Sequence, residues 1–219
     1  MAQGIVEKLS TATGGGLVLV VVATPMESGP VAPCLGNRSE LLVTGVGKSA
    51  SSVAVTQRLC RGGVGVVLNV GIAGSMPGSG LEIGALVAAT GHCFADEGVR
   101  TPDRFVTLAE LGFGPESARG MTIESDEVVL AELGKVADAL GVIATVSTCS
   151  GTDQLANEIK VRTGAVAEAM EGAAVSLACR AFGVPMGELR AVSNTTGDRA
   201  RQVWDVPRAL ASLEGAFAR

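Results

Sequence analysis

Four short apolar segments, each closed by glycine, proline or polar residues, constrain the fold of this chain more than any other feature. They cover residues 17–23, 40–44, 65–70 and 86–90. Apolar runs of this length without polar alternation are typical of strands that are covered on both faces. Such strands need helices on both sides of their sheet, so the sequence predicts an α/β architecture.

Stretches with helical spacing of apolar residues lie between and after these runs. The pattern predicts helices over residues 48–60, 125–140 and 168–182, and a closing amphipathic helix over residues 206–217. Gly183 and Pro185 end the third helix, and a further strand is expected over residues 186–193.

Length and composition fit one folded domain over residues 1–219, with residues 1–15 as a loose N-terminal lead-in. The chain has 219 residues, of which 47% are hydrophobic and 18% charged, so it can fill a large core and disorder is excluded. Its net charge of −5 argues against a nucleic-acid partner. The longest apolar run is far shorter than the roughly 20 residues of a membrane span, so no membrane partner is expected either.

Cysteine and histidine usage excludes several kinds of catalytic site. The five cysteines are scattered and form no Cys-x-x-Cys motif, which is typical of free thiols in a reducing cytoplasm. His92 is the only histidine, so neither a metal site nor a Ser-His-Asp triad has the residues it needs. We expect His92 to be a packed residue.

Three polar side chains lie either at the end of a predicted strand or within an apolar stretch of sequence. Glu171 lies in an almost wholly apolar stretch, so its carboxylate needs a partner, either a group such as Arg190 or a sugar diol. Asn194 follows the 186–193 strand and is either a turn residue or a ligand contact. Glu27 follows the first strand and is either a solvated loop charge or part of a site.

The segment NVGIAGS, residues 69–75, ends a predicted strand in small residues that let a ligand approach the backbone. A tight turn without a ligand explains it equally well. It is neither a phosphate-binding P-loop nor a dinucleotide-binding glycine pattern.

The motifs ATPME (23–27), GVGK (45–48), NVGIAGS (69–75), AEAMEGAA (167–174) and RAVSN (190–194) together resemble the purine nucleosidase and phosphorylase superfamily in order and spacing. Within it, FADEG (94–98), TPDRF (101–105), LGFG (111–114) and VWDVP (203–207) look like the futalosine hydrolase family. The resemblance implies a three-layer α/β fold with a central mixed sheet flanked by helices.

This resemblance also implies an activity. The family hydrolyses the N-ribosidic bond of futalosine, a 6-oxopurine nucleoside of menaquinone biosynthesis, and releases hypoxanthine and dehypoxanthine futalosine. It implies a small-molecule nucleoside substrate and no cofactor or metal. A cytoplasmic homo-oligomer, a dimer or larger, is expected.

The resemblance assigns roles to individual residues. Glu27 falls on the carboxylate that deprotonates water, and Asn194 on the residue that steadies the departing base, where adenine-specific relatives carry Asp. Glu171 falls on the residue that holds the ribose hydroxyls, and Met170 packs against the sugar. Three more residues are expected to contact substrate: Ile72, as a pocket wall, and Gly151 and Thr152.

Other functions of the same scaffold stay open. They are an inosine-type purine nucleoside phosphorylase, a methylthioadenosine/adenosylhomocysteine nucleosidase, and a nucleoside-binding or storage protein without turnover. The resemblance implies that phosphorylases of the superfamily hold phosphate with an Arg near this loop; NVGIAGS contains none, which favours water as the nucleophile. Arg100 or Arg104 is a candidate for the substrate's benzoate end, and the lone Trp204 for a ring-stacking residue or a core residue.

Overall fold

The side chains of the first strand are buried on both faces of the sheet, which places the sheet in the middle of the molecule. In β1 (Leu17–Val22), Val18, Val20 and Val22 pack into one hydrophobic cluster, whereas Leu19 and Val21 pack into another on the opposite face. Successive side chains of a strand point to opposite faces, so β1 is buried from both sides.

The computed structural model describes residues 4–113 and 122–218. Its strands are β1 (Leu17–Val22), β2 (Ser39–Val43), β3 (Val64–Ser75), β4 (Leu86–Phe94), β5 (Gly98–Arg100), β6 (Phe105–Thr107), β7 (Thr122–Glu124), β8 (Ala139–Thr145), β9 (Ala167–Ala169) and β10 (Met186–Thr195). Its helices are α1 (Ile5–Ala12), α2 (Pro25–Val31), the short 3-10 helix η1 (Ala32–Cys34), α3 (Lys48–Leu59), α4 (Glu127–Leu133), α5 (Asp153–Thr163), α6 (Gly172–Ala181) and α7 (Val206–Phe217).

Eight of these strands form one mixed sheet, which confirms the fold expected from the sequence. β1 pairs in parallel with β2 and β3, and β3 pairs in parallel with β10. β10 is antiparallel to β4, β4 and β9 are both parallel to β8, and β9 is antiparallel to β3. These pairings close a ring of five strands, in the order β3, β10, β4, β8 and β9. The carboxyl ends of β3, β8 and β10 lie together, next to β9.

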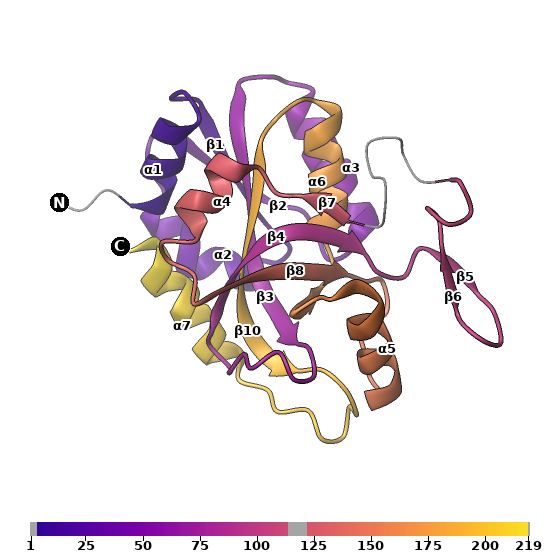
Figure 1. Cartoon of the computed structure of the whole chain (residues 1–219). Coiled ribbons are helices and arrows are strands. Elements are labelled where there is room, and N and C mark those ends of the chain that lie inside the picture. The colour runs from indigo at the N-terminus through magenta and orange to yellow at the C-terminus, as the bar shows by residue number, and fades with distance from the viewer. Residues whose placement is uncertain (1–3, 114–121, 219) are drawn as a thin grey trace.

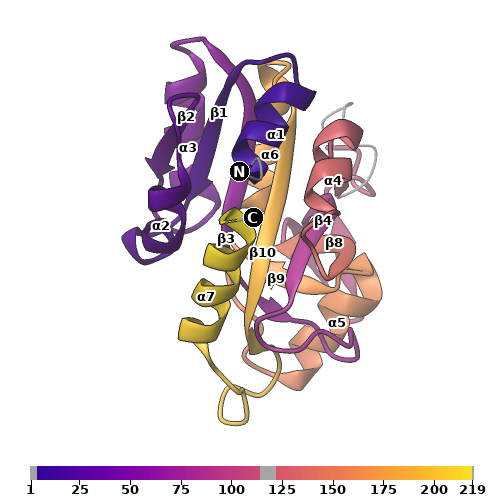
Figure 2. The ribbon, with the colours of Figure 1, turned by 90° about the vertical axis from the view of Figure 1, so that its left-hand side faces the viewer.

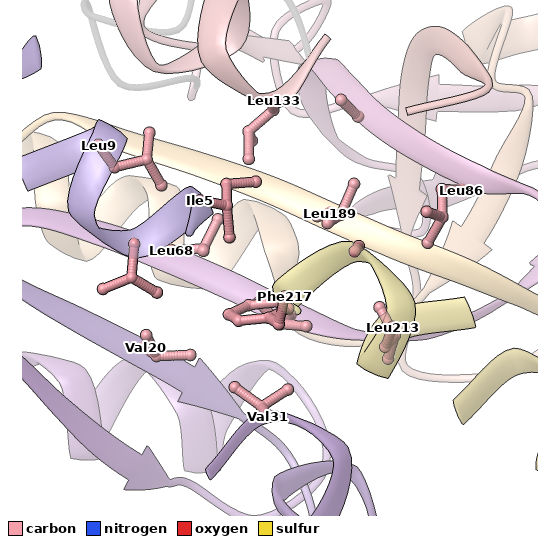
Figure 3. Packing of buried hydrophobic residues seen from close by; sticks show 14 of the residues in the cluster. Ile5, Leu9, Val20, Val31, Leu68, Leu86, Leu133, Leu189, Leu213 and Phe217 are labelled. Carbon is pink, nitrogen blue, oxygen red and sulfur yellow. The ribbon is translucent and has the colours of Figure 1, made fainter. Parts of the chain in front are cut away.

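Helices cover both faces of the sheet (Figure 1). The turned view shows α1 and α7 in front of the long strands β3 and β10 (Figure 2). Apolar residues from α1, α2, α4 and α7 meet the sheet there, among them Leu9, Val31, Leu133 and Leu213 (Figure 3). On the other face α3 and α6 pack through Val55, Leu59 and Val175.

Residues 5–12 differ from the loose lead-in expected over residues 1–15. Residues 5–12 form helix α1, and Ile5 and Leu9 are buried against the sheet and α7. They stand four residues apart, so they share one helical face. Burying each side chain stabilises the fold by roughly 1.5–3 kcal/mol, which is enough to order a segment that its glycine-rich end made look mobile.

Two predicted helices are wrong in extent. The helix expected over residues 125–140 ends at Leu133, and residues 139–145 form β8. The helix expected over residues 168–182 begins only at Gly172, because residues 167–169 pair with β3 and β8 as β9. In both places the backbone gains sheet hydrogen bonds that helical periodicity alone does not reveal.

β3 and β10 both extend beyond the ends expected from the sequence. β3 runs through the whole of NVGIAGS, and β10 continues to Thr195. The long loop after β4 contains the antiparallel pair β5–β6, which stands away from the sheet (Figure 1). Gly114, the last residue of the LGFG motif, lies outside the described residues. Within the described residues no helix has the length and apolar character needed to cross a bilayer.

Candidate active site

A cavity of about 550 Å³ opens where the carboxyl ends of β1, β3 and β10 meet the loops before α3, α5 and α6. This volume lies within the range of roughly 300–1,000 Å³ typical of small-molecule sites. Its lining consists of Ala23, Thr24, Met26, Glu27, Val46, Ile72, Ala73, Gly74, Cys149, Ser150, Gly151, Glu168, Ala169, Met170, Glu171, Arg190, Ser193, Asn194, Thr196, Arg199, Gln202 and Trp204. The three polar residues that the sequence singled out therefore share one cavity.

Glu27 is a buried residue of helix α2 and not a solvated loop charge. It is the third residue of that helix, and its Oε2 accepts hydrogen bonds from the backbone N–H (2.9 Å) and hydroxyl (2.8 Å) of Thr24. This is a capping box, which the Thr-x-x-Glu spacing specifies locally. Its Oε1 accepts a bond from the Ile72 N–H at 3.1 Å. Both oxygens are thus fixed before any ligand arrives.

Glu171 also has its partners inside the protein. Its Oε2 lies 3.1 Å from Nη2 of Arg190, and its Oε1 accepts a hydrogen bond from the Gly47 N–H at 2.9 Å. Gly47 has a φ of 95°, which only glycine adopts readily, so this approach depends on the glycine. The pairing with Arg190 is the structural alternative that the sequence left open, and it occurs together with exposure of Glu171 to the cavity.

Arg190 belongs to a chain of buried charges that runs away from the cavity. Its Nε lies 2.7 Å from Oε1 of Glu188, and Oε2 of Glu188 lies 2.8 Å from Nδ1 of His92. The other ring nitrogen of His92 is 3.0 Å from the Ser125 hydroxyl. His92 is therefore a packed residue, as expected, and its contacts anchor Glu188 beneath the site.

In this row of buried charges, ion pairing shifts the pKa values of Glu188 and Arg190 more than burial does. Burial by itself raises the pKa of Glu188, but the charge of Arg190 and the contact with His92 outweigh it, and the net pKa is lowered. Burial by itself lowers the pKa of Arg190, but the surrounding carboxylates outweigh it and the net pKa is raised. Arg190 therefore stays a cation between Glu188 and Glu171.

Asn194 owes its position to an irregularity in β10. The register against β3 shifts between Val192 and Asn194, so Ser193 and Asn194 both line the cavity although they are neighbours. Such a bulge re-aims a side chain that regular alternation would turn away. The Ser193 hydroxyl donates to Oδ1 of Asn194 at 2.8 Å, and Nδ2 of Asn194 donates to the Thr195 carbonyl at 2.9 Å.

The remaining expected contact residues divide into two groups. Ile72, Met170 and Gly151 line the cavity. Thr152 does not, because its hydroxyl accepts the Leu155 N–H at 3.2 Å and caps helix α5. The substrate contact expected of Thr152 stays a prediction, and in this structure its hydroxyl satisfies a helix end that would otherwise be unpaired.

The arginines considered for the benzoate end lie elsewhere. Arg100 is paired with Glu158 at 2.5 Å and Arg104 with Glu110 at 2.5 Å, both beside the β5–β6 pair. They line a separate hollow and not the cavity that holds Glu27. Within this chain, neither arginine faces the candidate site.

Two features of the cavity were missed from the sequence. Glu168 accepts hydrogen bonds from the Ser150 N–H (2.8 Å) and hydroxyl, and burial raises its pKa. The loop after β10 contributes Arg199 and Gln202, next to Trp204, which the sequence offers as a ring-stacking or core residue. Glu168 was hidden by the overlong helix, whereas Gly164 at the end of α5 was a usable signal that a new element starts there. Trp204 is 46% exposed at the cavity and is not a core residue.

The polar groups that line the cavity suit an organic ligand. Residues 4–113 and 122–218 contain no group of three or more His, Cys, Asp or Glu side chains that could hold a metal ion. The cavity instead offers fixed carboxylates, an amide and apolar walls. Fixed carboxylates can accept bonds from hydroxyl groups or activate water, and the amide can both donate and accept.

Comparison with known proteins identifies the family of this chain. Residues 34–218 match the family model of the phosphorylase superfamily. The futalosine hydrolase of Acidothermus cellulolyticus is 41% identical over 82% of this chain and 74% of its own length, and that of Streptomyces coelicolor is 34% identical over 82% and 77%.

Solved structures show the same fold. A futalosine hydrolase mutant of Helicobacter pylori superposes with a TM-score of 0.77 at 22% identity, over 93% of this chain and 97% of that one. A 5'-methylthioadenosine/S-adenosylhomocysteine nucleosidase of Neisseria meningitidis in complex with methylthio-immucillin-A gives 0.77 at 20% identity over the same shares. The chain belongs to the phosphorylase superfamily and, within it, to the futalosine hydrolase family.

Proposed function

We propose that this protein hydrolyses the N-ribosidic bond of futalosine and releases hypoxanthine and dehypoxanthine futalosine. The observation that carries the proposal is the convergence of Glu27, Glu171 and Asn194, from three distant parts of the chain, on one cavity. The 41% identity to a futalosine hydrolase supports the choice of substrate.

In the proposed reaction the bond between the ribosyl carbon and the purine nitrogen breaks, and its electron pair leaves with the base. A water molecule adds to the resulting oxocarbenium-like carbon, and the Glu27 carboxylate takes one of its protons. The departing hypoxanthine anion gains a proton from solvent and Glu27 returns its proton to solvent, so the atoms of one water are divided between the two products and the enzyme is restored. General-base help of this kind contributes roughly 10²–10⁴-fold.

The other residues act on binding and orientation. Each carboxylate oxygen of Glu171 has one partner in the protein, which leaves lone pairs for the ribose hydroxyls. Met170 supplies an apolar contact for the sugar. The amide of Asn194 can donate to a purine nitrogen or to a 6-oxo group and can accept from a ring N–H, which suits hypoxanthine.

The test is base release from three nucleosides, namely futalosine, inosine and methylthioadenosine, each with and without phosphate. We expect hypoxanthine from futalosine at a rate that phosphate does not change. Release that depends on phosphate would support a phosphorylase, and adenine release from methylthioadenosine would support the nucleosidase alternative. Binding of all three without any turnover would contradict the enzymatic assignment.

The cellular setting is part of the same proposal. A futalosine-cleaving enzyme belongs in menaquinone biosynthesis, and all five cysteines are free thiols, which fits the reducing cytoplasm. Met26 and Val46 line the cavity yet are 51% and 54% exposed. We propose that a second copy of the chain covers these two apolar side chains in a homo-oligomer, which light scattering of the purified protein would test.

A further inference from the structure

One cation in the cavity has no part in the chemistry described so far. Arg190 is neutralised by Glu188 and Glu171. Arg199 also lines the cavity, but within residues 4–113 and 122–218 no carboxylate lies within ion-pair distance of it. A guanidinium that is always charged and faces a ligand cavity without a counter-ion suits a ligand group that accepts hydrogen bonds or carries negative charge.

The side chain of Arg199 is held in place. Its Cζ lies 4.6 Å from the centre of the Trp204 ring, and its Nη1 donates to Oε1 of Gln202 at 2.9 Å. The Trp204 ring N–H donates to the same oxygen at 3.0 Å, and Gln202 in turn donates to the Ser150 carbonyl at 3.0 Å. The backbone N–H of Arg199 donates to the Gly151 carbonyl at 3.0 Å. Stacking and hydrogen bonding thus orient the guanidinium before substrate binds.

These contacts place Arg199 at one end of the cavity. Trp204, on which it stacks, forms an antiparallel bridge with Asn194. Arg190, by contrast, stands four residues earlier on β10, which corresponds to about 13 Å at the rise of a strand. Arg199 therefore belongs to the Asn194 end, where the proposed function places the purine base, and not to the end where Glu27 meets water.

We propose that Arg199 reads the 6-oxo group of the purine and stabilises the negative charge on the departing base. This inference rests on the proposed function and adds a specificity-determining residue to it. A guanidinium only donates hydrogen bonds, and hypoxanthine presents two adjacent acceptors, its 6-oxo oxygen and N7, to such a fork. Adenine presents a 6-amino donor at the same place, which the guanidinium cannot accept. Charge that gathers on the base as the bond breaks strengthens the contact with Arg199, which lowers the barrier.

The benzoate group of futalosine is a second group that the Arg199 guanidinium could bind. A comparison of substrates distinguishes binding of the benzoate from binding of the 6-oxo group. Futalosine and inosine share the 6-oxo base but differ in the benzoate tail. Aminodeoxyfutalosine and adenosine carry a 6-amino base and differ in the tail in the same way. Binding of free hypoxanthine and free adenine, measured by calorimetry, adds a comparison that involves no tail and no turnover.

The variants are Arg199→Met, which keeps an apolar stem over Trp204, and Arg199→Lys, which keeps the charge but loses the fork. Arg201→Met is the matched control, because Arg201 lies two residues away in the same loop but is paired with Asp153 and Asp198 outside the cavity. Circular dichroism melting confirms that each variant is folded.

We expect Arg199→Met to weaken hypoxanthine binding and to lower kcat/KM for both 6-oxo nucleosides by about 10- to 100-fold, the range of one bidentate base contact. Binding of adenine and cleavage of the 6-amino nucleosides should change less than about threefold. Arg199→Lys should lie between wild type and Arg199→Met, and Arg201→Met should match wild type.

Three results would overturn the inference. They are losses that follow the benzoate tail and not the base, equal losses in the Arg199 and Arg201 variants, and equal affinity of the wild-type protein for hypoxanthine and adenine. If wild type releases no hypoxanthine from futalosine, the proposed function fails, whereas the base-binding comparison still decides the role of Arg199.

Discussion

The two ends of the cavity are built in different ways. At the Glu27 end, the charged side chains of Glu27, Arg190 and Glu171 are almost fully buried, come from sheet strands or helix starts, and hold one another through ion pairs and backbone donors. At the Asn194 end, Arg199 and Trp204 come from a loop, are exposed, and are held by single hydrogen bonds and one ring contact.

We infer from this difference that the Glu27 end serves catalysis and the Asn194 end serves base specificity. A buried charge that loses its partner costs several kcal/mol, so substitutions at the Glu27 end that break the ion pairs of Arg190 endanger the fold. The exposed loop residues at the other end can be exchanged at little cost to stability. We therefore expect substitutions near Glu27 to affect turnover or folding, and substitutions near Asn194 to change which base is released.

The largest effect is expected for Glu27→Gln. The amide keeps the size of the side chain but cannot take a proton from water, so kcat for futalosine should fall by roughly 10²–10⁴-fold. Affinity for futalosine, measured by calorimetry, should change little. Unchanged turnover would remove Glu27 from the base role.

The next effect concerns folding. Glu188→Gln removes one of the two carboxylates that form ion pairs with the buried Arg190, and we expect a loss of about 3 kcal/mol or more in the free energy of unfolding measured with urea. Glu40→Gln is the matched control, because Glu40 forms an ion pair with Arg58 at the surface. A Glu188 variant as stable as the control would show that the buried chain of charges does not support the fold.

A smaller change is expected for Asn194→Asp, which introduces the side chain that the family resemblance predicts for adenine-specific enzymes. A mismatched polar group at the base costs roughly 1–3 kcal/mol, so the preference for hypoxanthine over adenine nucleosides should fall by about 5- to 150-fold. The kcat/KM ratio of futalosine to aminodeoxyfutalosine measures it. An unchanged ratio would place the base away from Asn194.

The pH dependence of stability should distinguish Glu168, which lines the cavity, from Glu188, which lies beneath it. The lowered pKa of Glu188 means that its contribution is complete above the unfolded value of about 4.3 and is lost as the pH falls through the folded pKa. Glu168 has a raised pKa, so its contribution falls as the pH rises from about 4.3 through the folded value. Urea unfolding below pH 5 should therefore show a shallower acid loss for Glu188→Gln than for wild type, and a parallel loss would contradict this.

The smallest effect is expected for Thr152→Ala. Removing the cap of α5 should cost about 1 kcal/mol of stability and leave KM for futalosine unchanged. A raised KM at unchanged stability would support the substrate contact expected of Thr152. Thermal melting and steady-state kinetics on the same preparation decide between the two.

Local chemistry made much of the fold and part of the site predictable. Continuous apolar runs revealed β1 and β2, and the spacing of residues 206–217 revealed α7 with its bounds. Glu27, Glu171 and Asn194 were found because a polar side chain at a strand end or among apolar residues needs a partner. The sequence could not show that β10 bulges at Ser193, since a bulge depends on the register with β3.

The errors share one physical cause. β9 is too short, and the start of β8 too mixed in polarity, to be predicted as strands from the sequence. They form strands because they pair with β3 and β4. Arg199 and Gln202 stand in a polar loop, where most side chains are solvated. Only the contacts with Trp204 and the Ser150 carbonyl bring them to the cavity.

The most direct test of the two-ended site is a crystal structure of the Glu27→Gln variant with futalosine bound. We predict the hypoxanthine ring between Asn194 and Arg199, the ribose hydroxyls at Glu171, and a water molecule between residue 27 and the ribosyl carbon. A base lying against Met26 and Val46, with the tail at Arg199, would contradict the account.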